Sequence, residues 1–282
     1  MRASDSRRNR MSEQGRRVTR PFRFGVVAPV GSDLSAWRDR VRRIADSGYS
    51  TFLMPDVPTW QPAVGPTLAT AAALADLRVG SWVYAAALRD PWSTAWEAHS
   101  LSMLTDGRFE MGIGAGRPGI EVELGLAAVS VAERRARMRE TVAALRTFDG
   151  ADRRTPVVMA VSGPKSEALA LEVADAVTFV LAADDDRVAT TKRVRDFAGR
   201  TDIELAQHVA AVGDRVAPFM AAPNLDTAAL RAADSLVILP SDPGAAAEEI
   251  QRRRDEIGFS YFVIGADFAD TLAPTVAKLA GH

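Results

Sequence analysis

The chain of 282 residues is long enough for one large domain or two small ones, and its 47% hydrophobic and 25% charged residues are typical of a globular protein. Its 35 basic and 36 acidic residues give a net charge of -1, so no global field would attract nucleic acid or an acidic membrane. The absence of cysteine excludes disulfides, thiolate metal sites and a cysteine nucleophile, and three scattered histidines do not indicate a metal site. Redox chemistry would therefore need a borrowed cofactor.

Residues 1–21 are rich in arginine, lack an apolar signal-sequence core and contain no aromatic residue. We therefore favour a disordered basic tail over a nucleic-acid-binding arm, and Met11 offers an alternative start of translation. No later run approaches the roughly 18 apolar residues of a membrane span. We expect a cytoplasmic protein in which one domain covers residues 22–282.

From Phe22 onward, short apolar runs alternate with helical patterns. Eight runs are predicted strands: Phe22–Ala28, Thr51–Met54, Val79–Tyr84, Phe109–Ile113, Val157–Val161, Val177–Leu181, Ile203–Val212 and Tyr261–Ile264. Helix start signals stand between them at Ser32 or Asp33, Asp90, Ser130 and Ser162. Eight such units match the size of a (β/α)8 TIM barrel, which needs about 250 residues. A doubly wound open sheet is the alternative.

One stretch interrupts this alternation. Between the seventh strand and the helix that begins near Gly244, Pro218–Asp242 contains a predicted helix at Leu225–Asp234 and a short apolar run at Leu236–Leu239. We interpret this stretch as an insertion in the seventh βα connection, on the face where barrel active sites lie.

A glycine cluster, Gly114-Ala-Gly-Arg-Pro-Gly119, directly follows the fourth predicted strand and fits the dinucleotide-binding pattern. A dinucleotide-binding loop opens straight into a helix, whereas here the next helix is expected only near Ser130. No carboxylate follows the next strand to hold a ribose. We therefore favour a barrel mouth at which missing side chains let a flat ring lie against the backbone.

Ser162-Gly163-Pro164-Lys165 joins the end of the fifth predicted strand to a helix. Free backbone N–H groups, a hydroxyl and a cationic side chain at this point would suit a phosphate group. An ordinary capped helix explains the same residues equally well.

Several motifs occur in the order found in one known family: Val79–Tyr84, Arg89-Asp90-Pro91, Thr105–Gly116, Glu121–Leu126, Arg134–Leu145, Ser162–Lys165 and Gly258–Val263. Through these motifs the chain resembles the luciferase-like flavin and deazaflavin oxidoreductases over Phe22–Leu279. It is most similar to the actinobacterial-type members that use coenzyme F420, although the FMN-using branch shares most of these residues.

The resemblance implies a TIM barrel that binds F420 or FMN at the carboxyl ends of its strands. In the family, strand three ends in a non-prolyl cis peptide bond against the central ring, and this bond falls on Trp82-Val83 here. Gly114, Ala115 and Gly116 would flank the ring. We expect a bulky residue at Gly114 to block the ring and leave the barrel folded, because this glycine ends a strand.

The resemblance also places the cofactor phosphate on the loop after strand five, at Ser162, Gly163 and Lys165. The chain departs from the family after strand two, where many relatives carry Asp-His and this sequence has Asp56-Val57.

With that histidine absent, Asp56 and Tyr84 are the candidate catalytic replacements. A solvated or capping role explains Asp56 equally well, and simple packing is favoured for Tyr84. We interpret His208 as a hydrogen-bonded core residue.

Three functions follow from these residues. The leading hypothesis is hydride transfer between F420 and a small organic substrate. The second is a two-component monooxygenase that takes reduced FMN from a separate flavin reductase. The third is a non-catalytic barrel that binds a cofactor or partner. We expect a homodimer in each case.

Overall fold

The computed structural model describes residues 20–182, 185–220 and 225–282. In these residues eight parallel strands form the barrel wall: β1 (Arg23–Val27), β2 (Thr51–Met54), β3 (Arg78–Ser81), β5 (Phe109–Gly114), β6 (Val157–Val161), β7 (Ala176–Phe179), β8 (Glu204–Val209) and β12 (Phe259–Gly265). The sheet closes because β3 pairs with both β2 and β5. The predicted TIM barrel is confirmed, and the open sheet is excluded.

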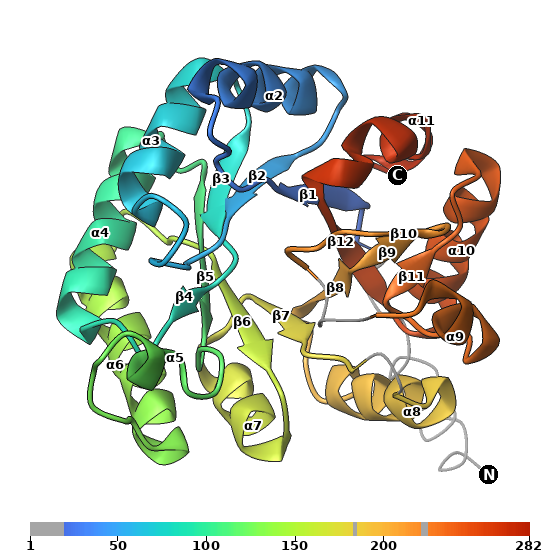
Figure 1. Cartoon of the computed structure of the whole chain (residues 1–282). Helices are drawn as coiled ribbons and strands as arrows, with labels where there is room; N and C mark the ends of the chain where they lie inside the picture. Colours follow the sequence, from blue (N-terminus) through green and yellow to red (C-terminus); the bar gives the residue numbers. More distant parts are fainter. Residues whose placement is uncertain (1–19, 183–184, 221–224) are drawn as a thin grey trace, which may run out of the picture.

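Helices surround the strands on the outside (Figure 1). They are α2 (Leu34–Asp46), α3 (Val64–Leu74), α4 (Pro91–Leu104), α6 (Val131–Asp149), α7 (Pro164–Val173), α8 (Arg187–Ala198), α10 (Pro243–Glu256) and α11 (Ala269–Leu279), the last preceded by a 3-10 turn at Ala266–Phe268. None of the helices in the described residues has the length and hydrophobicity needed to cross a bilayer. Residues 1–19 of the predicted tail lie outside the described residues, so the domain boundary stays a prediction.

The predicted helix starts are correct at Asp33, Asp90 and Ser130, whose side chains each accept a backbone N–H of the first turn. At α7 the helix begins at Pro164 as predicted, but Ser162 is not its N-cap residue. The N-cap residue is Gly163, and the hydroxyl of Ser166 one turn later accepts the N–H groups of Ser162 and Gly163.

The third predicted strand is interrupted. The apolar run Val79–Tyr84 predicted one strand, but β3 ends at Ser81 and β4 (Tyr84–Ala85) follows the cis peptide bond Trp82-Val83, where the resemblance places the end of strand three. At the interruption the Ser81 carbonyl oxygen approaches β5 so closely that a Cβ at Gly112 would lie 2.0 Å from it. Only glycine fits at this position of β5.

The seventh strand is shorter than predicted. The chain leaves the barrel after β8, and Ala210 donates its N–H to the carbonyl of Val237. The apolar run therefore continues into a second sheet, built from β9 (Ala211–Val212), β10 (Arg215–Val216) and β11 (Ile238–Leu239), with α9 (Thr227–Ala232) before β11.

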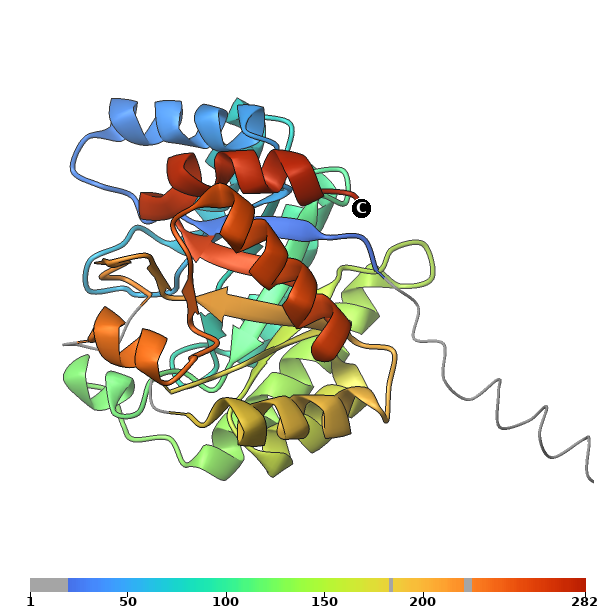
Figure 2. The ribbon, with the colours of Figure 1, turned by 90° about the vertical axis from the view of Figure 1, so that its right-hand side faces the viewer.

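This small sheet and α9 form the predicted insertion, which thus begins near residue 210 and not at Pro218. Figure 2 shows it, in orange, at the end of the barrel toward which the β8 arrow points, together with the short helix α5 (Ile120–Glu123) in green. The insertion therefore lies at the carboxyl ends of the strands, as expected.

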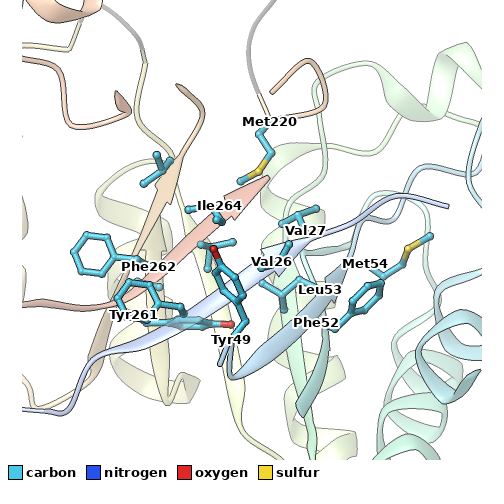
Figure 3. Packing of buried hydrophobic residues seen from close by; sticks show 14 of the residues in the cluster. Val26, Val27, Tyr49, Phe52, Leu53, Met54, Met220, Tyr261, Phe262 and Ile264 are labelled. Carbon is cyan, nitrogen blue, oxygen red and sulfur yellow. The ribbon is translucent and has the colours of Figure 1, made fainter. Parts of the chain in front are cut away.

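A charged cluster fills the barrel interior below this end. Tyr261 donates its hydroxyl to Glu110 at 2.7 Å, and Arg23 forms ion pairs with Glu110 at 2.7 Å and with Glu204 at 2.8 Å. Burial, followed by the nearby Glu110 charge, raises the pKa of Tyr261 well above its ordinary value, so the phenol stays protonated. Apolar side chains of β1, β2 and β12 add to the buried core (Figure 3).

Gly112→Ala should lower the free energy of unfolding by about 2 kcal/mol or more, because the new methyl group would force the backbones of β3 and β5 apart. Urea unfolding measures this difference. Gly31→Ala is the matched control, since a Cβ there meets no atom within 4 Å. Equal stability of the two variants would show that the barrel relaxes freely at the interruption.

Candidate functional site

A cavity of about 250 Å³ lies at the carboxyl ends of the strands. Its walls come from the interruption after β3, from β6, β7 and β8 with the segments that follow them, and from the insertion: Trp82, Val83, Ala160, Thr178, Phe179, Val180, Leu181, His208, Met220 and Val237. Among the described residues, none of those that line the cavity is an aspartate, glutamate, lysine or arginine. A cavity with such walls suits an uncharged and largely apolar ligand group.

A larger cavity of about 410 Å³ opens at the other end of the barrel, among residues such as Arg20, Glu204 and Arg254. Barrel enzymes carry their sites at the carboxyl ends of the strands, so the smaller cavity is the stronger candidate. Among the described residues there is no group of three or more His, Asp or Glu side chains arranged to hold a metal ion.

Gly114 ends β5 beside this cavity but is not in open space. A Cβ there would lie 2.9 Å from Val83 Cγ2 and 3.1 Å from the Ala160 Cβ. A bulky side chain at Gly114 would therefore collide with Val83 and Ala160 of the cavity wall. The expectation that the barrel stays folded with such a residue stays a prediction. Gly116 has φ +87°, a conformation that favours glycine, and Ala115 lies between the two glycines.

Arg134 holds the loop after β5. Its guanidinium pairs with Glu121 and donates to the carbonyls of Ala115 and Gly116 at 3.5 and 3.3 Å. Both charged side chains are buried, and Glu121 also accepts the N–H of Val129. Sequence reasoning missed this pair and the one-turn helix α5, although Glu121 and Arg134 both fall in motifs shared with the family.

The segment Ser162–Lys165 lies at the same end of the barrel, directly after β6. Ser162 and Lys165 are exposed, and Gly163 is half-buried. The hydroxyl of Ser166 already accepts the N–H groups of Ser162 and Gly163, at 3.0 and 3.1 Å. The Ser166 hydroxyl in turn donates to the carbonyl of Gly163 at 2.8 Å. An anion at this helix start would therefore meet the Lys165 ammonium, while the N–H groups of Ser162 and Gly163 are already hydrogen-bonded.

Asp56 and Tyr84 lie together but outside the cavity. Asp56 accepts two hydrogen bonds from Arg89, at 2.7 and 3.0 Å, and one from the N–H of Ala85. Tyr84 donates to Glu97 of α4 at 2.6 Å, and the Arg89 guanidinium lies 4.1 Å from its ring centroid. Burial raises the pKa of Tyr84 well above its ordinary value, helped by the Glu97 charge. This cluster fixes β4 against α4.

His208 lines the cavity and is hydrogen-bonded, as the sequence suggested. Its Nε2 lies 2.7 Å from the carbonyl oxygen of Met220 in the insertion. Burial lowers the pKa of His208, and the hydrogen bond to Met220 opposes this effect, so the imidazole is neutral near pH 7. Figure 3 shows Met220 near the end of β12, where Gly265 leaves room for its sulfur.

Thr178 is a functional candidate that the sequence analysis missed. It is 4% exposed and lines the cavity from β7. Within the described part of the chain its hydroxyl has no hydrogen-bond partner. The signal was present in the sequence, because Thr178 is the polar residue at an inward position of an otherwise apolar strand.

Solved structures share this barrel. The coenzyme F420-dependent tetrahydromethanopterin reductase from Methanopyrus kandleri is 16% identical, with a TM-score of 0.70, over 92% of this chain and 98% of that one. An F420-dependent secondary alcohol dehydrogenase, solved with an F420-acetone adduct, is 18% identical with a TM-score of 0.69, over 91% and 98%. A riboflavin lyase, solved with modified FMN and riboflavin, is 12% identical with a TM-score of 0.65, over 92% of each chain.

These likenesses concern the fold, and comparison with curated proteins gives no significant match. The family assignment comes from the sequence itself, because residues 18–217 match the family model described as luciferase-like monooxygenase. This match covers most of the barrel, from β1 to β10, including every wall of the cavity except Met220 and Val237. The chain therefore belongs to the luciferase-like monooxygenase family.

Proposed function

We propose that this chain is an oxidoreductase that binds the deazaflavin F420 and transfers hydride between it and a small organic substrate. The observation that carries the proposal is the uncharged cavity at the carboxyl ends of the strands, in a member of this family. Two structural neighbours that are F420-dependent support the choice of cofactor.

The residues present fit a flat conjugated ring. The cavity is apolar apart from Thr178 and His208, and the unpartnered hydroxyl of Thr178 offers a hydrogen bond to a ligand. Trp82 and Val83 would support one side of the ring, and Gly114, Ala115 and Gly116 would allow its close approach. When bound, the cofactor would supply the carbon that donates or accepts the hydride.

The chain's own part is to hold the ring and exclude water. Met220 and Val237 of the insertion contribute apolar walls to the cavity. Ser162, Gly163 and Lys165 would hold the cofactor phosphate, with the Ser166 hydroxyl fixing the backbone of Ser162 and Gly163. Asp56 would act by fixing Arg89, and Tyr84 by fixing Glu97, because both are bonded to these residues outside the cavity.

Two alternatives have support of their own. Use of reduced FMN from a separate reductase, in a two-component monooxygenase, is supported by the family description and by the neighbour solved with modified FMN. A non-catalytic, ligand-binding barrel is supported by the absence of the Asp-His pair and by the commitment of Asp56 and Tyr84 to other residues.

Lys165→Ala should weaken binding of F420 on the order of ten-fold or more, because a charge-assisted phosphate contact is worth roughly 1.5–3 kcal/mol. Titration calorimetry measures the dissociation constant. Lys192→Ala is the matched control, since Lys192 is exposed and paired with Asp196 on α8. Unchanged affinity of Lys165→Ala for F420 would show that the cofactor phosphate does not bind at the start of α7.

The intact chain should bind F420 more tightly than FMN. The longer anionic tail of F420 can reach further basic groups at the mouth such as Arg117, which is exposed and paired with Glu123. Calorimetric titration with both cofactors measures the preference. Tight FMN binding without F420 binding would favour the monooxygenase, and binding of neither would favour the non-catalytic barrel.

We also propose that the chain forms a homodimer through α4. Trp92 and Trp96 are each 57% exposed and lie one helical turn apart, with their ring centroids 5.7 Å from each other. Met103 and Leu104 extend this exposed apolar surface. Exposed aromatic and methionine side chains of this kind are typical of protein interfaces.

The double variant Trp92→Arg, Trp96→Arg should sediment as a monomer in analytical ultracentrifugation, because four charges would be brought together across the α4 interface of a symmetric dimer. The control is Val188→Arg, which places a charge at an exposed apolar residue of α8. A double variant that remains dimeric would show that the interface does not lie on α4. A monomeric wild type would contradict the proposed homodimer.

A further inference from the structure

The hydroxyl of Thr178 is placed for a ligand. On the barrel wall Thr178 pairs with Ala160 of β6 and with Ala206 of β8. Both neighbours are small, and neither side chain has a polar atom to bond the hydroxyl. A buried hydroxyl without a partner destabilises the folded chain unless a ligand or water supplies the missing hydrogen bond.

His208 supplies a second polar group in the same cavity, from the adjacent strand. Since the Met220 carbonyl can only accept, the Nε2 of His208 must carry the proton of their hydrogen bond. In a neutral imidazole the other ring nitrogen, Nδ1, is then an acceptor. The cavity walls thus combine a hydroxyl donor with an imidazole acceptor. None of the described wall residues carries a formal charge.

We propose that Thr178 and His208 together bind the imide edge of the cofactor ring. The Thr178 hydroxyl donates to a ring carbonyl, and His208 Nδ1 accepts from the neighbouring ring N–H. This inference rests on the proposed function, and it applies equally to F420 and FMN, because both rings carry the same pyrimidinedione edge. A substrate carbonyl would need the donor alone, so the paired donor and acceptor favour the imide edge.

Thr178→Val tests the donor because valine has the same shape without the hydroxyl. The variant should bind F420 and FMN about ten-fold more weakly than wild type, whereas Thr178→Ser should keep near-normal affinity. The melting temperature of Thr178→Val without cofactor should equal or exceed that of wild type, since the hydroxyl has no hydrogen-bond partner among the described residues. Thr141→Val is the control: its buried hydroxyl donates to the Arg137 carbonyl, so stability should fall and affinity should not.

FMN methylated at the imide nitrogen tests the acceptor. It cannot donate to His208 Nδ1, so wild type should bind it at least ten-fold more weakly than FMN. Equal binding of the methylated and unmodified rings would overturn the role of His208.

Wild-type affinity in Thr178→Val would overturn the role of the threonine and leave the proposed function intact. A lower melting temperature of this variant would show that the hydroxyl is structural, and would also overturn the inference. Failure of wild type to bind either cofactor would overturn the proposed function and the inference together.

Discussion

The close approach of the Ser81 carbonyl to β5 shapes the whole site. Because Gly112 has no side chain, the carbonyl of Ser81 at the end of β3 can lie against β5. Trp82 and Val83 then connect β3 to β4. Gly114 repeats this arrangement two residues later, where the Val83 side chain takes the space that a Cβ would fill. The two inward glycines of β5 thus place Trp82 and Val83 at the mouth, where they form one wall of the cavity.

The barrel separates charge from apolar surface along its axis. In the barrel interior below the cavity, Glu110 forms an ion pair with Arg23 and accepts a hydrogen bond from the phenol of Tyr261. The Trp82 ring packs edge-on against Tyr261, with 6.3 Å between centroids, and so joins this cluster to the cavity. Because the charges are paired among themselves, the cavity above offers a ligand mainly apolar contacts and the two neutral groups of Thr178 and His208.

The barrel could be predicted from the sequence because alternation of strands and helices is a local pattern, and six of the eight predicted strands match to within about two residues at each end. The two strands with wrong bounds are those whose ends are determined by tertiary contacts. The run Ile203–Val212 stays apolar while the chain moves from one sheet to another at Ala210, and the run Val79–Tyr84 is interrupted where Gly112 of β5 lies opposite. Local propensity carries no sign of either event.

The candidate site was harder to predict for the same reason. Asp56 and Tyr84 lie at strand ends, where the catalytic residues of barrel enzymes are common. The orientation of their side chains depends on hydrogen bonds to Arg89 and Glu97, which are distant in sequence. Thr178 is a polar residue in an apolar strand, but threonine is also common in ordinary strands. Its lack of a hydrogen-bond partner among the described residues is visible only in the structure.

The crystal structure of the chain with F420 or FMN bound is the most direct test of this account. The cofactor ring should lie in the cavity between Trp82-Val83 and the ends of β7 and β8, with the cofactor phosphate near Lys165. A ring bound at the opposite end of the barrel, beside Arg20 and Arg254, would contradict it.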